Sequence, residues 1–286
     1  MDLSKYKYFY VNGSSFTEGC GLEEPGRKEI CVHPMYEKLY GVKWNNKGEV
    51  NYGKRLSEIL NIPCHNDAVC GSGLDRVVRT TYNFILNNWE DRDKFFIILE
   101  KIDPFRADVY YKPMNEYFIV TSTHNKEKDI THFQYATRRY YEPSVKKEDE
   151  TLQPEFRKWF DNHFDIEEKY LQDERNFIGL YSFCKMNNIK IFVMSANTVY
   201  FNECFDVNDI VKFDDNGNYD DPYNWCLRNE LTITHELELT LKEKKYWDYH
   251  PGYFGHIEYA KKLARFLGYE GDFNLPDKKK IINGII

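Results

Sequence analysis

The sequence contains no C-x-x-C pair, although it has seven cysteines. Zinc ribbons and thioredoxin-type redox centres are built on such closely spaced pairs, so neither class of site is indicated. An odd number of irregularly spaced cysteines is typical of free thiols in a reducing compartment. We therefore expect a cytoplasmic protein.

Long apolar runs are also missing. No stretch reaches the roughly 18 consecutive apolar residues that a membrane-spanning helix needs, so no membrane span is expected. The N-terminus, Met1-Asp-Leu-Ser-Lys5, lacks a basic segment followed by an apolar one. We accordingly expect no signal peptide.

Basic residues are fewer than acidic ones: the chain has 39 Lys and Arg against 46 Asp and Glu, so its net charge is −7. Binding to a phosphate backbone needs a basic face, so nucleic acid is not an expected partner. The hydrophobic content of 42% with 30% charged residues is typical of a globular chain. With 286 residues, we predict one domain over 1–286 that carries insertions. The oligomeric state stays open.

Aromatic residues, in contrast, are abundant, with 23 Tyr and 20 Phe making up most of the 17% aromatic content. Two interpretations remain open. The rings could fill the core of a chain whose composition is biased towards Lys, Asn and Tyr, or they could form a surface that stacks on sugars.

Apolar runs and helical periodicities alternate along the chain, which predicts a parallel sheet covered on both sides. The predicted fold class is α/β: a three-layer α/β/α sandwich with a central parallel sheet and insertions. The continuous apolar run at 95–99 suits a central strand that is buried on both faces. The predicted elements are strands at 8–11, within 61–69, at 94–102 and at 189–194, and helices at 54–60, 74–89 and 251–267.

Residues 107–150 form a predicted insertion. Two strands, 107–111 and 117–122, read as a hairpin, and the polar stretch 123–150 reads as a loop or an inserted lobe. A long helical pattern follows over 154–187, with a break near Phe164 and Asp165. Residues 21–53 are predicted to be loops with a short helix around Tyr36, and 202–245 give no clear pattern.

The first strand ends in the sequence Asn12-Gly13-Ser14-Ser15, a combination that favours a tight turn. Reactive residues of α/β proteins lie at the carboxyl ends of strands, and a hydroxyl on a sharp turn can serve as a nucleophile. An ordinary turn is the alternative. The residues alone do not choose between the two serines.

A second candidate lies near the last helix, where Asp248 and His250 stand two residues apart. A carboxylate beside an imidazole fixes its tautomer and stabilises its protonated form, which a serine nucleophile requires. A polar loop with a helix cap is the alternative. His256, inside the helix, is interpreted as a packing or hydrogen-bonding residue.

Together these motifs resemble the SGNH (GDSL-type) serine hydrolases and esterases. Gly13 to Gly19 is similar to their first block, Gly-Asp-Ser, with Ser14 in place of Asp, and Asp248-Tyr-His250-Pro251 is similar to their last. Asn66 to Gly71 is similar to the second block. The stretch that follows, from Gly73 to Thr81, is closest in style to phage, viral and bacterial members. The resemblance implies a flavodoxin-like fold.

The resemblance also implies a function, that of a serine ester hydrolase with an acyl-enzyme intermediate. It assigns Ser15 as nucleophile, His250 as base and Asp248 as its partner, with the N–H groups of Ser15 and Gly71 as oxyanion hole. No metal or cofactor is implied. The substrate would be a small-molecule or glycan ester, either an O-acetylated carbohydrate or a small lipid ester. Asn66 and Arg106 are candidate substrate-binding residues.

One block departs from the family pattern. The third block supplies an Asn as oxyanion donor, but Phe96 to Arg106 contains none. The alternative is therefore a catalytically impaired SGNH-fold protein with a binding or structural role, such as a component of a virion.

Overall fold

The structure is a computed structural model of the chain. The described residues are 1–19, 51–69, 71–102, 106–111, 116–125, 130–137, 158, 162, 165–195, 201, 203–212, 222–232, 234–235 and 250–273. The short helix expected around Tyr36 lies outside them, as does Asp248. In strands β5 and β6, introduced below, only the backbone is described.

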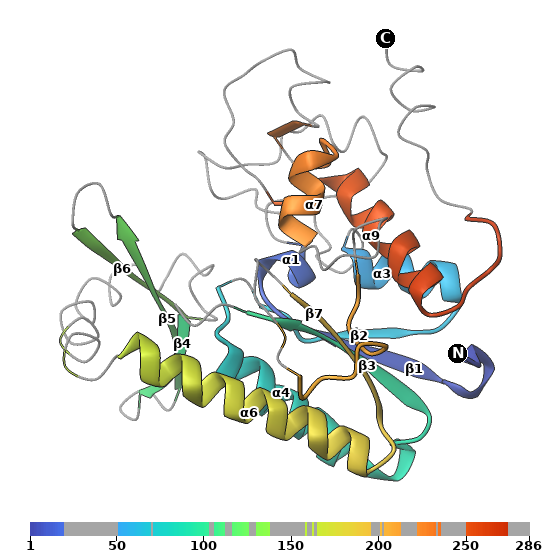
Figure 1. Cartoon of the computed structure of the whole chain (residues 1–286), viewed down its shortest axis with the longest axis horizontal. Helices are drawn as coiled ribbons and strands as arrows, with labels where there is room; N and C mark the ends of the chain where they lie inside the picture. The colour runs from blue at the N-terminus through green and yellow to red at the C-terminus, as the bar shows by residue number, and fades with distance from the viewer. Residues whose placement is uncertain are drawn as a thin grey trace.

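Four parallel strands form the central sheet, and this confirms the predicted α/β class (Figure 1). Their spatial order is β2-β1-β3-β7, the order of a flavodoxin-like doubly wound sheet. Each strand falls on a segment that the sequence predicts as a strand, and β1 and β7 each end one residue later than predicted. The strands are β1 (Tyr8–Asn12), β2 (Cys64–Asn66), β3 (Phe95–Lys101) and β7 (Lys190–Ser195).

Helices cover both faces of this sheet, which confirms the three layers (Figure 1). One face carries α3 (Tyr52–Leu60) and α9 (Tyr253–Phe266), and the other carries α4 (Leu74–Asn87) and α6 (Ile166–Met186). The short helix α7 (Pro222–Arg228) packs on α9 through stacked rings of Trp225 and Tyr259.

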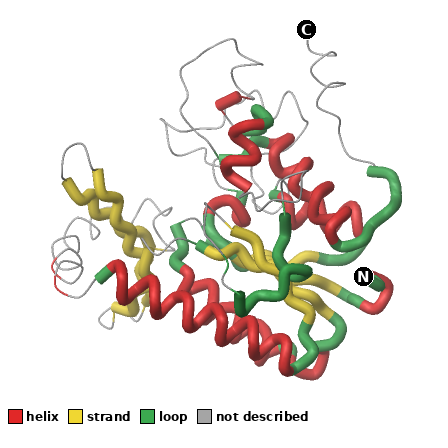
Figure 2. The backbone as a smooth tube through the Cα atoms, in the orientation of Figure 1, coloured by secondary structure: helices red, strands yellow, loops and turns green. Residues whose placement is uncertain are grey.

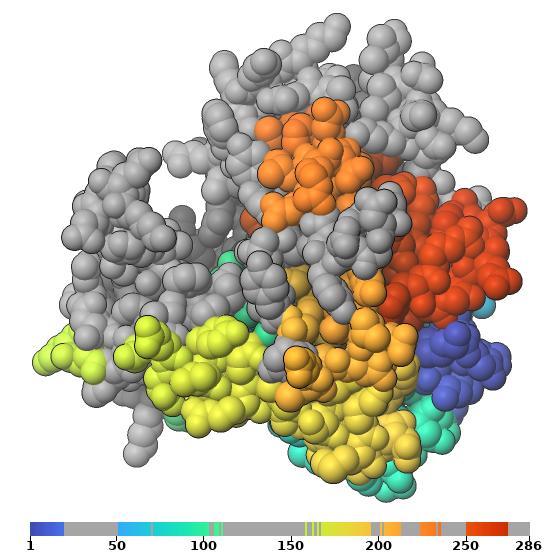
Figure 3. Space-filling model, in the orientation of Figure 1, coloured from blue at the N-terminus to red at the C-terminus, as the bar shows by residue number. Residues whose placement is uncertain are grey.

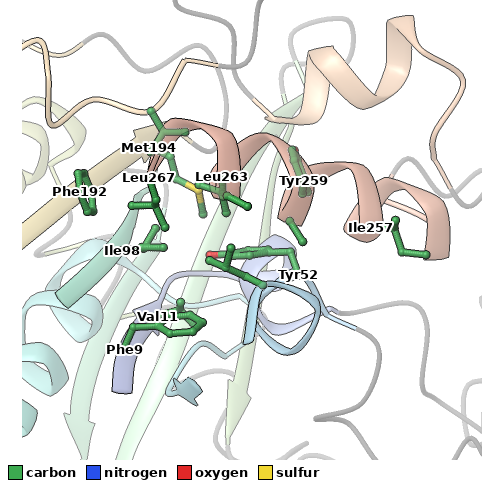
Figure 4. Packing of buried hydrophobic residues seen from close by; sticks show 14 of the residues in the cluster. Phe9, Val11, Tyr52, Ile98, Phe192, Met194, Ile257, Tyr259, Leu263 and Leu267 are labelled. Atoms are coloured by element: carbon green, nitrogen blue, oxygen red, sulfur yellow. The ribbon is translucent and has the colours of Figure 1, made fainter. Parts of the chain in front are cut away.

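The core between the sheet and the α3–α9 layer arises from strand alternation. Phe9 and Val11 point to this face, while Tyr10 between them points to the α4–α6 face. Figure 4 shows Phe9, Val11 and Ile98 facing Leu263 of α9 and Tyr52 of α3. Burial of each such side chain stabilises the fold by about 1.5–3 kcal/mol.

Strand β3 is buried at all of its positions, as its continuous apolar run predicts. Ile97 and Leu99 pack with Tyr10 and with apolar residues of α4 and α6 such as Val77 and Leu180. The outer side of α6 forms much of the surface in the space-filling view (Figure 3). Burial on two faces fixes β3 as a central strand.

A second, antiparallel sheet stands beside the first (Figure 2). It contains β4 (Arg106–Tyr111), β5 (Glu116–Asn125) and β6 (Ile130–Thr137) in that order. The predicted hairpin is confirmed, whereas a loop is the wrong interpretation for 130–137. There β-branched and aromatic residues recur through the segment, a strand signal that its polar average conceals.

Two helix starts follow from local chemistry. Asp165 caps α6 by accepting hydrogen bonds from the N–H groups of Glu167 and Glu168, at 2.8 and 3.0 Å, which confirms the predicted break. The last helix begins at Tyr253, later than predicted, because Pro251 pairs with Thr232 in an isolated bridge instead.

Within the described ranges, no helix has both the length and the apolar composition to cross a bilayer.

Candidate active site

The candidate site lies where the chain changes sides of the sheet. From β1 it passes through α3 on one face to β2, and from β2 it passes through α4 on the opposite face to β3. The carboxyl ends of β1 and β3 are neighbours, since Asn12 pairs with Leu99. In doubly wound sheets such a switch point forms the ligand-binding crevice.

The turn after β1 is held tightly. The Asn12 side chain accepts a hydrogen bond from the Gly13 N–H (2.9 Å) and donates to the hydroxyl oxygens of Thr80 (2.7 Å) and Tyr10 (2.9 Å). A Cβ atom at Gly13 would collide with the Glu100 carboxylate. Glycine is required at this position by close approach.

Glu100, the penultimate residue of β3, binds the turn from the neighbouring strand. Its fully buried carboxylate accepts from the Ser14 N–H (2.7 Å), from Ser14 Oγ (2.7 Å) and from Thr17 Oγ1 (2.6 Å). Such charge-assisted bonds are among the stronger ones in proteins. An acid is thus present at the turn although Ser14 stands where the resemblance expects one. Glu100 is a site residue that was not predicted, since its only signal in the sequence is a lone acid in an apolar strand.

Ser15 begins the short helix α1 (Ser15–Glu18) and is buried. Gly19 ends this helix with a φ of +86°, and its N–H donates to the Ser15 carbonyl oxygen at 3.1 Å. Among the described residues, no side chain or backbone group forms a hydrogen bond with Ser15 Oγ. The hydroxyl is therefore not committed to holding the turn.

The structure brings His250 to the same turn. Its ring centroid lies 5.2 Å from that of Phe16, the residue after Ser15, and the side chain is half-buried. No hydrogen bond joins His250 to Ser15 in the described structure. The role of Asp248 remains a prediction because that residue lies outside the described ranges.

The loop after β2 lies against the turn. The Val69 N–H donates to the Gly13 carbonyl oxygen (3.3 Å), and Gly71 follows with a φ of +79°, a conformation that favours glycine. Asn66 donates to the Thr17 carbonyl oxygen (3.0 Å) and accepts from the Ala68 N–H (2.9 Å). Asn66 thus joins α1 to this loop, and its role in substrate binding stays a prediction.

Arg106 is the first residue of β4 and is half-buried. It forms no ion pair with any other described residue. Its carbonyl oxygen would lie 2.7 Å from a Cβ atom at Gly73, so the second sheet starts directly against the loop that contains Gly71. An anchoring role for the Arg106 guanidinium remains a prediction.

His256 lies in α9, on the chain after His250, and is fully buried. Its Nδ1 accepts from the Tyr52 N–H at 3.2 Å, which assigns the proton to Nε2. Burial, with contributions from His250 and Arg55, lowers the pKa of His256 to about 3. The ring is neutral and joins α9 to α3, in agreement with the expected packing role.

The buried His256 predicts a loss of stability in acid. Below pH 6.5 the unfolded chain binds a proton on this histidine that the folded chain does not, until the pH reaches about 3. His256→Asn retains an acceptor but does not titrate. Between pH 7 and pH 5, urea unfolding should show wild type losing roughly 2 kcal/mol more than the variant. Equal losses would contradict the assignment.

The chain has little similarity to known proteins. No protein-family model matches the chain, and no curated protein matches it. Among solved structures, one chain is described as "a putative lipolytic protein of G-D-S-L family from Desulfitobacterium hafniense DCB-2". It is 13% identical with a TM-score of 0.31, over 91% of this chain and 99% of that chain. A likeness at this level adds no argument to the site geometry.

Proposed function

We propose that this protein is a serine ester hydrolase of the SGNH (GDSL) type, with Ser15 as nucleophile, His250 as general base and Asp248 as its partner. One observation carries the proposal. A buried serine with an uncommitted hydroxyl stands at the switch point of the sheet, and a histidine from the other end of the chain packs against Phe16, the residue that follows this serine. Serine with an adjacent imidazole is the arrangement of nucleophilic acyl transfer.

The proposed reaction has two steps. Ser15 Oγ attacks the ester carbonyl carbon while His250 takes its proton, and the alcohol leaves with that proton, so an acyl-Ser15 ester remains. Water then attacks the acyl carbon, His250 again carries the proton, and the acid is released. Asp248 would hold the His250 tautomer. The His250 ring must move to reach Ser15 Oγ, as catalytic hydrogen bonds often form fully only when the substrate is bound.

The oxyanion would be held by the N–H groups of Ser15 and Gly71. The Glu100 carboxylate, at the end of β3, only accepts hydrogen bonds and therefore cannot replace an Asn donor. Loss of one oxyanion donor costs about 100- to 1000-fold in turnover. We expect a slow enzyme.

The polar surroundings support a small acyl group on a polar alcohol. The start of β4 with Arg106 lies against the loop that contains Gly71. We propose an O-acetyl group on a carbohydrate as the preferred substrate over a small lipid ester. Hydrolysis rates on acetylated glycans and on short acyl lipids would rank the two.

The rival function is a catalytically impaired binding or structural protein, such as a virion component. The observation that favours it is Glu100 at the strand end where an oxyanion donor is expected. The uncommitted Ser15 hydroxyl favours the enzyme instead. The two functions differ in whether Ser15 reacts.

A fluorophosphonate probe tests this directly. We expect wild type to be labelled, with the added mass on the peptide that carries Ser15, and to hydrolyse p-nitrophenyl acetate. Ser15→Ala should remove both, because the probe reacts only with an activated hydroxyl.

Thr17→Ser serves as a matched control because it keeps the hydroxyl that binds Glu100. It should be labelled like wild type. A wild-type protein that is folded but neither labelled nor hydrolytic would sink the proposed enzyme and leave the binding function.

A further inference from the structure

A pocket opens at the edge of the central sheet, between β2 and α4. Its volume is about 550 Å³, within the range of small-molecule sites. The residues that give it its chemistry are Tyr8, His65, Asp67, Asn83, Phe84 and Asn87.

This pocket is separate from the Ser15 turn. His65 stands opposite Tyr10 in the β1–β2 register, and both side chains belong to the α4 side of the sheet. Helix α1, which begins at Ser15, packs on the other side, where the hydroxyls of Thr17 and Tyr52 of α3 lie 3.1 Å apart. Of the turn residues, Asn12 reaches the α4 side, where it donates to Thr80 in the pocket lining. The function of the pocket does not depend on the proposed hydrolysis.

Aromatic rings form one wall of the pocket. Phe84 lies centrally, with ring centroids 5.4 Å from His65 and 6.2 Å from Tyr8. Phe84 also stacks on Tyr10 at 4.1 Å, so its ring is held in place from behind. Phe84 itself is buried, so the rings that a ligand can reach are those of the exposed His65 and the half-buried Tyr8, which can pack against its C–H groups.

Planar polar groups complete the lining of the pocket. Asn83 and Asn87 lie one helical turn apart on α4 and are exposed, and their side-chain amides make no hydrogen bond with another described residue. Asp67 accepts from Tyr10 OH (3.2 Å) and pairs with His65 Nε2 (3.3 Å). The hydrogen bond to His65 lowers the pKa of Asp67, so its carboxylate is an acceptor at neutral pH.

We infer that this pocket binds a neutral saccharide. Two free amides and a carboxylate supply donors and acceptors for neighbouring hydroxyl groups, while the ring wall suits the C–H face of a sugar ring. A phosphate-bearing ligand fits poorly, because the described lining contains Asp67 but neither Lys nor Arg. An acyl chain fits poorly because amide and carboxylate groups would lose their hydration.

The test uses the full chain and three ester-free probes: maltose, lactose and N,N′-diacetylchitobiose. Saturation-transfer NMR and calorimetry should detect at least one of them, with a Kd of about 1 mM. The double variant Asn83→Ala/Asn87→Ala should weaken that binding about tenfold or more, because it removes both amides. Both side chains are exposed, so the variant should fold.

Two matched variants complete the design. Leu86→Ala changes an exposed residue of α4 that does not line the pocket, and it should bind like wild type. Ser15→Ala should also bind like wild type, since the probes carry no ester. Absence of binding by wild type, or unchanged binding by the Asn83/Asn87 variant, would overturn the saccharide site. If Ser15→Ala lost binding, the sugar would bind at the Ser15 turn instead, and the proposed saccharide site would also be overturned.

Discussion

Ser15→Ala, His250→Ala and the double variant are each expected to lose ester hydrolysis by the same factor, about 10⁴- to 10⁶-fold. A serine nucleophile and its base act as one unit, so once either is removed the other no longer contributes to catalysis. Residual turnover would come from binding and from the backbone donors at the oxyanion hole. The measurement is kcat/KM for p-nitrophenyl acetate in all three variants.

Ser14→Ala is the matched control, because it alters the neighbouring serine and removes one hydrogen bond to Glu100. It should retain labelling and most of the turnover. If the losses of the two single variants multiplied in the double variant, His250 would not act through Ser15. If Ser14→Ala were the inactive variant, the nucleophile would be the other serine of the turn.

Much of the fold follows from the sequence because its signals are local. The apolar run of β3 contains five residues that no surface strand would carry, and this identifies a central strand without knowledge of its neighbours. Asp165 marks the start of α6 through its own side chain. The β6 strand was missed because its segment is polar on average, and its partner β5 is needed to define it.

The site is less predictable because its contacts join residues that are far apart in the sequence. Asn12-Gly13 indicates a turn, but the Glu100 carboxylate that holds it lies 86 positions away. Nothing local in a lone acid of an apolar strand says which donors it will meet. The approach of His250 to Phe16 joins the two ends of the chain, and only the resemblance to a known family anticipated it.

Glu100→Ala is expected to destabilise the protein by about 3–5 kcal/mol. The substitution leaves three donors without their acceptor, the Ser14 N–H and the hydroxyls of Ser14 and Thr17, in a buried place. Each unsatisfied buried group costs about 1–3 kcal/mol, partly relieved where a hydroxyl can rotate. Urea unfolding measures the loss, and Glu58→Ala, which removes only part-exposed ion pairs on α3, should cost less than about 1 kcal/mol.

Glu100→Gln separates the charge of this residue from its shape. Its amide oxygen can accept from the Ser14 N–H and the Thr17 hydroxyl, and its NH₂ group can donate to Ser14 Oγ. Stability should therefore return to within about 1–2 kcal/mol of wild type, with kcat following it. At a permissive temperature, Glu100→Ala should lower kcat about 100-fold because the nucleophile turn is displaced. If Glu100→Ala kept both stability and kcat, the carboxylate would not hold the turn. If Glu100→Gln lost as much kcat as Glu100→Ala while staying folded, the negative charge itself would be needed, and positioning alone would not explain why an acid stands there.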